Sequence, residues 1–348
     1  MEKLKELLLI PGISGYENKV IEFLKKEFSN LKYKYTRDNL GSIIFTKDNS
    51  NKDSNLKRIV IDAHIDEVGF LITELNENGT VVIESVGGLN LKLMQGQVFE
   101  VWDTNFENYN LAILTFPNQQ EKDLDLTKAI LDLGFRSKKD LLSSNIKIGS
   151  SVTFPSFYQE NKDSILSKSI DNRLGAFIAL NLAKKLNERD LNFNINFVFS
   201  VQEEVGLRGS RTAVYDLNPD LVIVVDISPS YELEGKSSPY GLLGQGTMLR
   251  HKDVYTIYKK DVVIFLRNLF DESKIKYQNY FSFGGTNAGI IQLIKDGILV
   301  IPFGLVARNI HTSLAIVDKK DLEETEKGLE ILINKIDQNL KTKGILLN

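Results

Sequence analysis

The chain has 348 residues and contains no cysteine, one tryptophan and only three histidines. The lack of cysteine excludes disulfide bonds, thiolate zinc sites and cysteine nucleophiles, so any bound metal must be held by imidazole and carboxylate groups. No segment reaches the roughly 18 consecutive apolar residues of a membrane-spanning helix. The apolar run from Leu7 to Ile10 is too short, and its neighbours are too acidic, for a secretory signal. We therefore expect a cytoplasmic protein.

The composition is that of an ordinary globular protein. Hydrophobic residues make up 42% and charged residues 26% of the chain, which is typical of soluble domains. A formal net charge of −3 gives no electrostatic reason to expect nucleic acid or an anionic membrane as a partner. The length of 348 residues favours two structural units.

Two elements are predicted before the first histidine. Ser14 is followed three residues later by Glu17, which is the pattern of a capping box, and apolar residues at helical spacing follow. This pattern predicts a helix that is capped by Ser14. Residues Arg58 to Ala63 are mostly apolar and are predicted as a buried strand, which ends at His64.

From about Phe70 to Ser164, short β-like runs alternate with turns. Gly87-Gly88 and Gly149 separate these runs. The pattern predicts a small all-β unit inserted into a larger domain. The predicted division is a discontinuous main domain of residues 1–69 and 165–348 and an inserted domain of residues 70–164.

After Ser164, helical and strand-like segments alternate. Residues 171–186 are predicted as a helix, and residues 193–201, where apolar and mostly polar residues alternate, as a strand. Residues 221–225 form the short apolar run of a parallel strand buried on both faces, and residues 299–301 begin another. A helix over about 319–340 closes the chain. This alternation predicts an α/β fold with a mixed, largely parallel sheet and helices on both faces.

The histidines are few enough for their contexts to be informative. His64 directly follows a predicted strand, where it could simply bond to the backbone. Asp66 lies two residues further on, and a carboxylate that accepts the second ring N–H is the usual partner of a metal-bound histidine. This arrangement favours His64 as a metal ligand. We interpret His251 as structural or exposed.

Several acidic residues occupy comparable positions. Asp171 begins a predicted helix, where an aspartate is most often a cap or a partner of the helix dipole. Glu203 and Glu204 follow the strand of residues 193–201, and Asp226 ends the run of residues 221–225. Charges at the end of a buried strand are costly unless something neutralises them, and a metal ion would do so.

These residues are expected to converge. His64, the Glu203–Glu204 pair and Asp226 follow predicted strands, and His311 lies in a loop a few residues after another. Ligands of open α/β sheets bind outside the carboxyl ends of the strands. Two histidines with several carboxylates and no thiolate suit zinc, cobalt or manganese. Two such ions about 3.5–4 Å apart would hold a hydroxide and a carbonyl oxygen during hydrolysis.

At these residues the sequence resembles the glutamyl, deblocking and tetrahedral (TET-like) aminopeptidases, a family of dinuclear metallopeptidases. The similar segments run almost from end to end, and the segments Ala63–Phe70 and Gln202–Gly209 are the most specific. The other similar segments are Pro11–Glu17, Asp38–Gly41, Gly87-Gly88, Asp171–Gly175, Asp226, Gly284–Thr286 and Ile310-His311.

The resemblance implies a function and a division of roles. The chain would remove N-terminal residues from peptides with two divalent ions, preferably zinc. The implied roles are His64 and Asp226 as ligands of one ion, Glu204 and His311 as ligands of the other, Asp171 as the bridge, Glu203 as general base and Asp66 as the group that orients His64. The implied architecture is a zinc-peptidase-like domain with an inserted β-barrel or PDZ-like domain that serves dimerisation or assembly. Self-association as a dimer or a hollow dodecamer is also implied.

Two alternatives remain open at this point. Asn287 stands where the family has aspartate, and Thr312 to Ala315 replace a Ser-Pro-x-Glu run after His311, which leaves room for a catalytically silent scaffold or a peptide-binding protein. A glucanase is the other alternative, although glycoside hydrolysis needs two carboxylates and no metal. The candidates for binding an acidic substrate side chain are Arg250, Lys252 and Arg308.

Overall fold

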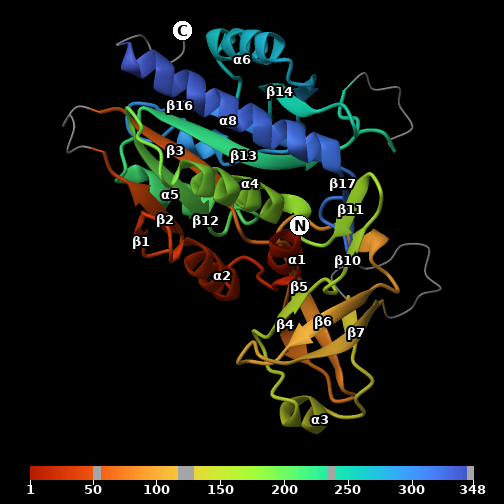
Figure 1. Ribbon diagram of the computed structural model, residues 1–348. Helices are drawn as coiled ribbons and strands as arrows, with labels where there is room; N and C mark the ends of the chain where they lie inside the picture. Colours follow the sequence, from red (N-terminus) through yellow and green to blue (C-terminus); the bar gives the residue numbers. More distant parts are fainter. Residues whose placement is uncertain (50–55, 117–128, 234–239, 343–348) are drawn as a thin grey trace.

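The computed structural model describes residues 1–49, 56–116, 129–233 and 240–342. These residues form a layered α/β body and a smaller β-barrel that projects from it (Figure 1). None of the helices in these ranges is long and apolar enough to cross a membrane. The α/β fold predicted from the sequence is confirmed.

A six-stranded mixed sheet forms the centre of the larger body. Its strands, in spatial order, are β1 (Lys34–Arg37), β2 (Ile43–Lys47), β12 (Asn194–Ser200), β3 (Arg58–His64), β13 (Leu221–Pro229) and β16 (Leu299–Ala307). The last four run parallel, and β2 and β1 add antiparallel strands at one edge. All seven residues of β12 are buried, including Asn194 and Asn196, because both faces of the sheet are covered.

Helices pack against the two faces of this sheet. Helices α2 (Asn18–Phe28) and α4 (Ile170–Leu186) lie on the face to which Phe197 points, since Phe28 contacts that ring. Helices α5 (Arg208–Tyr215) and α7 (Ala288–Ile291) lie on the other face, where Asn287 at the start of α7 bonds to Asp62 of β3. The long helix α8 (Lys319–Lys341) contacts α4 and β16.

Smaller elements complete the larger body. They are helices α1 (Glu2–Leu9) and α6 (Lys260–Ser273), the three-stranded sheet of β10 (Tyr158–Glu160), β11 (Ser164–Ser167) and β17 (Ala315–Asp318), and the parallel pair of β14 (Thr247–Lys252) and β15 (Tyr277–Phe281).

The core side chain Phe197 gives a direct test of this packing. Its ring is fully buried and lies 5.6 Å from the ring of Tyr33. We expect Phe197→Ala to lower the free energy of unfolding by about 3–5 kcal/mol, through lost burial and the cavity left behind. Urea unfolding followed by circular dichroism measures this change. Phe283→Ala is the matched control, because Phe283 is 76% exposed. If Phe283→Ala lowered the free energy of unfolding as much as Phe197→Ala does, the assignment of Phe197 to the core would be contradicted.

The predicted capping box at Ser14 is wrong. Helix α2 begins at Asn18, and its N-cap residue Glu17 makes no side-chain cap. The Ser14 hydroxyl instead donates to Asp66 at 2.6 Å, and Glu17 accepts the backbone N–H groups of Gly15 and Gln202. Both side chains serve a distant loop rather than the helix end, so a local pattern could not reveal their partners.

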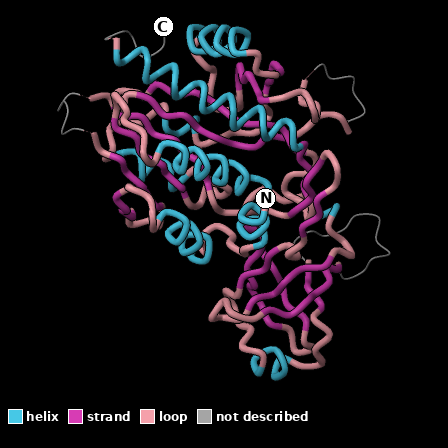
Figure 2. Tube along the Cα trace, viewed as in Figure 1, coloured by secondary structure: helices cyan, strands magenta, loops and turns pink. Residues whose placement is uncertain are grey.

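The barrel is closed and has a hydrophobic core of its own. Its strands, in spatial order, are β4 (Gly69–Leu75), β5 (Thr80–Val86), β8 (Ile130–Asp132), β7 (Tyr109–Thr115), β6 (Val98–Trp102) and β9 (Ser151–Thr153). The short helices η1 (Leu91–Leu93) and α3 (Lys138–Ser143) accompany them. Figure 2 shows this group of strands apart from the helices of the larger body. The first strand, β4, pairs with the last, β9, so the chain enters and leaves the barrel side by side.

Side chains from α2 and the loop before it contact the barrel. The ammonium group of Lys19 lies 4.5 Å from the Trp102 ring and 4.7 Å from the Phe106 ring. The hydroxyl of Tyr16 donates to the carbonyl of Gly149 at 2.7 Å. These contacts hold the barrel against the N-terminal part of the larger body.

Candidate metal centre

The predicted ligands come from five separate segments that meet at one end of the sheet. His64 is the last residue of β3, and Glu203 and Glu204 lie in the turn after β12. Asp171 lies in the first turn of α4, where the backbone is not yet helical. His311 lies between β16 and β17. The structure thus brings together all five predicted metal ligands and the predicted base.

Asp226 is placed differently from the prediction. It lies within β13 rather than at its end, because β13 continues to Pro229 and stays paired with β16 up to Ala307. The pairing of β13 with β3 stops earlier, at Val224. One edge of β13 is therefore free of β3 at Asp226, and its side chain reaches the end of β3 from the neighbouring strand.

The turn that carries Glu203 and Glu204 is tightly closed. The N–H groups of Arg208 and Gly209 donate back to the carbonyls of Gln202 and Val201, at 3.1 and 3.0 Å. A Cβ atom on Gly209 would lie 2.2 Å from the Val201 carbonyl oxygen, so only glycine permits this approach. The closed turn keeps both glutamates at the end of β12.

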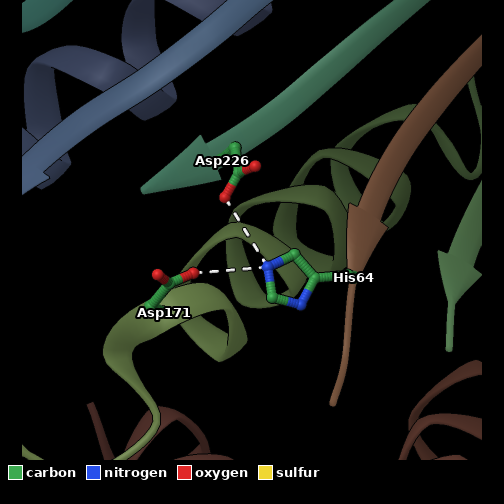
Figure 3. Close-up of side chains that lie close together, drawn as sticks. All are labelled: His64, Asp171 and Asp226. Carbon is green, nitrogen blue, oxygen red and sulfur yellow. Dashed lines mark ion pairs between the residues drawn. The ribbon is translucent and has the colours of Figure 1, made fainter. Parts of the chain in front are cut away.

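His64 faces three carboxylates through one ring nitrogen. Its Nε2 atom lies 3.3 Å from Oδ1 of Asp171, 3.7 Å from Oδ1 of Asp226 and 3.9 Å from Oε2 of Glu203. Figure 3 shows Asp171 and Asp226 converging on this nitrogen from α4 and β13. One imidazole and two carboxylates around a common point match the donors that a divalent ion accepts.

His311 forms a second group with the same aspartate. Its Nε2 atom lies 3.1 Å from Oε1 of Glu204 and 3.4 Å from Oδ2 of Asp171. The two oxygens of Asp171 therefore face different imidazoles, Oδ1 towards His64 and Oδ2 towards His311. This is the arrangement expected of a carboxylate that bridges two adjacent ions.

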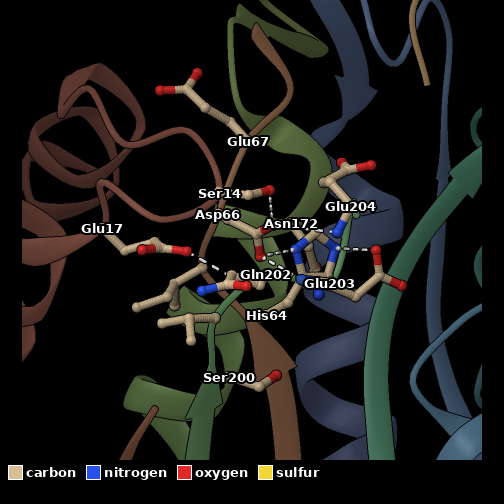
Figure 4. A network of polar contacts seen from close by, with 12 residues as sticks. Ser14, Glu17, His64, Asp66, Glu67, Asn172, Ser200, Gln202, Glu203 and Glu204 are labelled. Carbon is tan, nitrogen blue, oxygen red and sulfur yellow. Dashed lines mark hydrogen bonds and ion pairs between the residues drawn. The ribbon is translucent and has the colours of Figure 1, made fainter. Parts of the chain in front are cut away.

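Asp66 connects His64 to the glutamate turn. Its Oδ1 atom lies 3.3 Å from Nδ1 of His64 and accepts the N–H of Glu203 at 3.0 Å. Its Oδ2 atom accepts the N–H of Glu204 at 3.1 Å and the hydroxyl of Ser14 (Figure 4). One buried carboxylate thus fixes the ring of His64 and the backbone of both glutamates.

The electrostatics of the cluster favour a bound cation. Burial raises the pKa values of Glu203 and Glu204, and burial also raises the pKa of Asp226 to about 7. Burial alone would lower the pKa of His311, but the carboxylates of Glu204 and Asp171 raise it to about 11. Among the described residues, no lysine or arginine forms an ion pair with Asp171, Glu203, Glu204 or Asp226.

One buried polar atom of this group, Oδ1 of Asp171, also lacks a hydrogen-bond partner in the described part of the chain. Buried polar atoms are normally satisfied, so an unpartnered carboxylate oxygen aimed at an imidazole points to a bound cation. The donor set therefore fits a pair of divalent ions, held without thiolates.

Sequence reasoning missed a supporting network next to the centre. Glu67 is buried and accepts the Nζ group of Lys168 at 2.7 Å and the hydroxyl of Ser169 at 2.6 Å. It also accepts the N–H of Gly12. The network joins the segment after β3 to the segment before Asp171. Its only signal in the sequence was the position of Glu67 in the Ala63–Phe70 segment.

A pocket of about 410 Å³ opens over the cluster. Beyond the ligands and Glu203, its described wall consists mostly of small and apolar residues, among them Leu207, Ile227 and Gly284. None of the predicted basic residues lies in this described wall. Arg308 pairs with Glu232, and Arg250 is buried behind Ser228, to which it donates.

His251, as expected, lies apart from the cluster, where it stacks on Phe281 and bonds to Asn279.

Asn287 lies beneath the cluster rather than in the pocket wall. Its side-chain amide donates to Asp62 at 2.8 Å and to the hydroxyl of Ser200 at 3.0 Å, and its Oδ1 atom accepts the hydroxyl of Ser210. All of its polar atoms are thus used within the protein. The departure from the family pattern at this position leaves the geometry of the ligands intact.

The fold and this cluster define a metal-dependent peptidase. A family model for the M42 glutamyl aminopeptidases matches residues 41–327. The chain is 31% identical to a glutamyl aminopeptidase of Lactococcus lactis, over 97% of this chain and 96% of that protein. The chain therefore belongs to the M42 peptidase family and is a metal-dependent aminopeptidase.

Solved structures agree with this assignment. An aminopeptidase from the archaeon Desulfurococcus kamchatkensis superimposes with a TM-score of 0.90 at 24% identity, covering 100% of this chain and 98% of that chain. The dodecameric TET1 peptidase of Pyrococcus horikoshii superimposes with a TM-score of 0.84 at 25% identity, covering 95% and 98% of the two chains. The first likeness concerns the fold alone.

Proposed function

We propose that this aminopeptidase uses two divalent ions and the roles predicted for its six clustered side chains. His64 and Asp226 would hold one ion, Glu204 and His311 the other, and Asp171 would bridge them. The observation that carries this proposal is the placement of Asp171, whose two carboxylate oxygens face the two imidazoles at 3.3 and 3.4 Å. Zinc is the preferred ion, with cobalt and manganese as alternatives, because the donors are nitrogen and oxygen only.

Glu203 is proposed as the general base. Ions held by the ligands would supply Lewis acidity to the scissile carbonyl and to the attacking water. The Glu203 carboxylate, buried beside His64, would take a proton from that water and return it to the leaving amine nitrogen. Burial raises the pKa of Glu203, which brings a carboxylate closer to the range in which it both accepts and donates a proton near neutral pH.

The two largest hydrophobic cores support a division of the chain into two domains. One core lies within residues 4–65 and 165–336 and the other within residues 68–154. We propose residues 1–69 and 165–348 as the catalytic domain and residues 70–164 as an inserted domain for dimerisation or assembly. Self-association is supported by the similarity to the dodecameric TET1 peptidase. The cytoplasm is the proposed compartment.

The function is tested with a panel of amino-acid anilides and short peptides. We expect the zinc-, cobalt- or manganese-loaded chain to release N-terminal residues, and a chelator to abolish the release until metal is added back. A matched panel of peptides with acetylated N-termini should be cleaved far more slowly, since an aminopeptidase acts beside a free α-amine. Absence of turnover with all three metals would refute the proposal.

The same assay separates the alternatives. A silent scaffold or peptide-binding protein would bind peptides without turnover and need not hold two ions per chain. A glucanase would retain activity on a glucan after chelation. The family match and the converging donors favour the peptidase over both.

A further inference from the structure

The loop that follows β5, at the base of the barrel, reaches into the metal centre. The last residue of β5, Val86, pairs with Gly69, the first residue of β4. Because Gly69 lies only a few residues after His64 in the chain, this end of the β4–β5 pair is held beside the ligands. Gly87 and Gly88 follow Val86 directly, and Gly88 lines the pocket together with His311.

Gly88 makes a direct contact with a predicted ligand. Its carbonyl oxygen lies 2.9 Å from Nδ1 of His311. A carbonyl can only accept, so Nδ1 carries the proton of this bond. In the neutral ring, Nε2 is then left with its lone pair towards Glu204 and Asp171. His311 itself is in a loop, with φ of +58°, so no regular element fixes its ring.

Gly87 leaves the space that Glu204 occupies. Its φ is +87°, and a Cβ atom on it would lie 2.6 Å from Cγ1 of Val68 and 3.2 Å from Cβ of Glu204. An alanine there would be strained and would press on the second ligand of the same ion. Gly88 differs, because its added Cβ would meet only His311 Nδ1, at an ordinary 3.8 Å.

We propose that the Gly87-Gly88 loop of the inserted barrel is a positioning element of the metal centre, which orients His311 and makes room for Glu204. The two imidazole rings are thus oriented by different parts of the chain. Asp66, close to His64 in the sequence, orients the ring of His64, and the Gly88 carbonyl of the barrel orients the ring of His311. The ion bound by Glu204 and His311 depends on the insert, whereas the ion bound by His64 and Asp226 does not. This inference rests on the proposed two-ion site but not on its peptidase activity.

Zinc titration of the chelator-treated full-length chain tests the loop without an activity assay. We expect wild type to bind two ions and Gly87→Ala to lose affinity for one of them by about 10–100-fold, the usual effect of disturbing the groups that orient a ligand. Gly134→Ala is the matched control, because Gly134 in the barrel also has a positive φ, +74°, but an added Cβ there meets no described atom within 4 Å. It should bind two ions as wild type does. Circular dichroism spectra and melting temperatures check that both variants fold.

Three outcomes of this titration would overturn the proposal. They are unchanged binding of both ions by Gly87→Ala, loss of both ions together, and equal impairment of Gly134→Ala. Binding of a single ion by wild type would refute the two-ion function instead, and the orientation of His311 would then be decided by spectroscopy alone.

Solid-state ¹⁵N spectra of the zinc-loaded chain provide a measurement that does not depend on the glycine variants. The chain has only three histidines, so the imidazole signals are few, and His251→Gln removes the one outside the centre. We expect His311 to carry its proton on Nδ1 and to face the metal through Nε2. A metal-bound or unprotonated Nδ1 in His311 would overturn the proposal.

Discussion

Replacing Glu203 with glutamine is expected to lower kcat for peptide hydrolysis by about 10²–10⁴-fold, the usual contribution of a positioned general base. Glutamine has nearly the same shape but cannot accept a proton from the attacking water. Initial rates over a range of substrate concentrations measure the effect on kcat and KM separately. KM should change little, because the proposed role of Glu203 is proton transfer rather than substrate binding.

The control for this variant is the metal content. Glu203→Gln should still bind two ions, since Glu203 is the member of the cluster that is not needed as a ligand. Glu74→Gln, an exposed position on β4, should have wild-type activity. Full activity of Glu203→Gln would exclude it as the base, and loss of an ion would identify it as a ligand instead.

The second large effect is expected for Asp171→Asn. An asparagine side chain has one carbonyl oxygen and one NH₂ group. It therefore cannot present an oxygen to both proposed ions, the one beside His64 and the one beside His311. Disturbing the groups around a ligand weakens metal binding by about 10–100-fold, and loss of the bridging ligand itself should cost more than about 100-fold at both positions. Zinc titration of the metal-free chain measures both affinities.

Asp163→Asn is a suitable control, because Asp163 is exposed and lies only a few residues earlier in the chain. It should bind metal as wild type does. If Asp171→Asn weakens only one ion, Asp171 is a ligand to that ion and not a bridge. If it binds both ions normally, the assignment of Asp171 is wrong.

The sequence predicted which side chains lie close together better than it predicted their surroundings. His64, Glu203 and Glu204 were identified because charge and imidazole at the end of an apolar strand need a partner. The prediction placed Asp226 beside the other predicted ligands but gave it the wrong local structure, since the strand continues beyond the apolar run to Pro229. Pairing with β16, which a single segment cannot reveal, extends it.

What the sequence could not provide were contacts between distant segments. Ser14 and Glu17 matched a local capping pattern, yet both bond to the loop region around Asp66 and Gln202. The bond between Gly88 and His311 joins residues far apart in the chain. Likewise, all of β12 is buried because helices cover both faces of the sheet, and no periodicity within the strand indicates that.

The pairing of β4 with β9 has a consequence for how the catalytic sheet folds. The neighbours β3 and β12 are separated in sequence by the whole barrel, so bringing them together in an unfolded chain would require closing a very long loop. Once the barrel has formed, its entry and exit strands are hydrogen-bonded neighbours, so the loop that remains to be closed is mainly the segment between β9 and β12. A barrel that folds early would therefore lower the entropy cost of pairing β3 with β12 and speed the formation of the sheet.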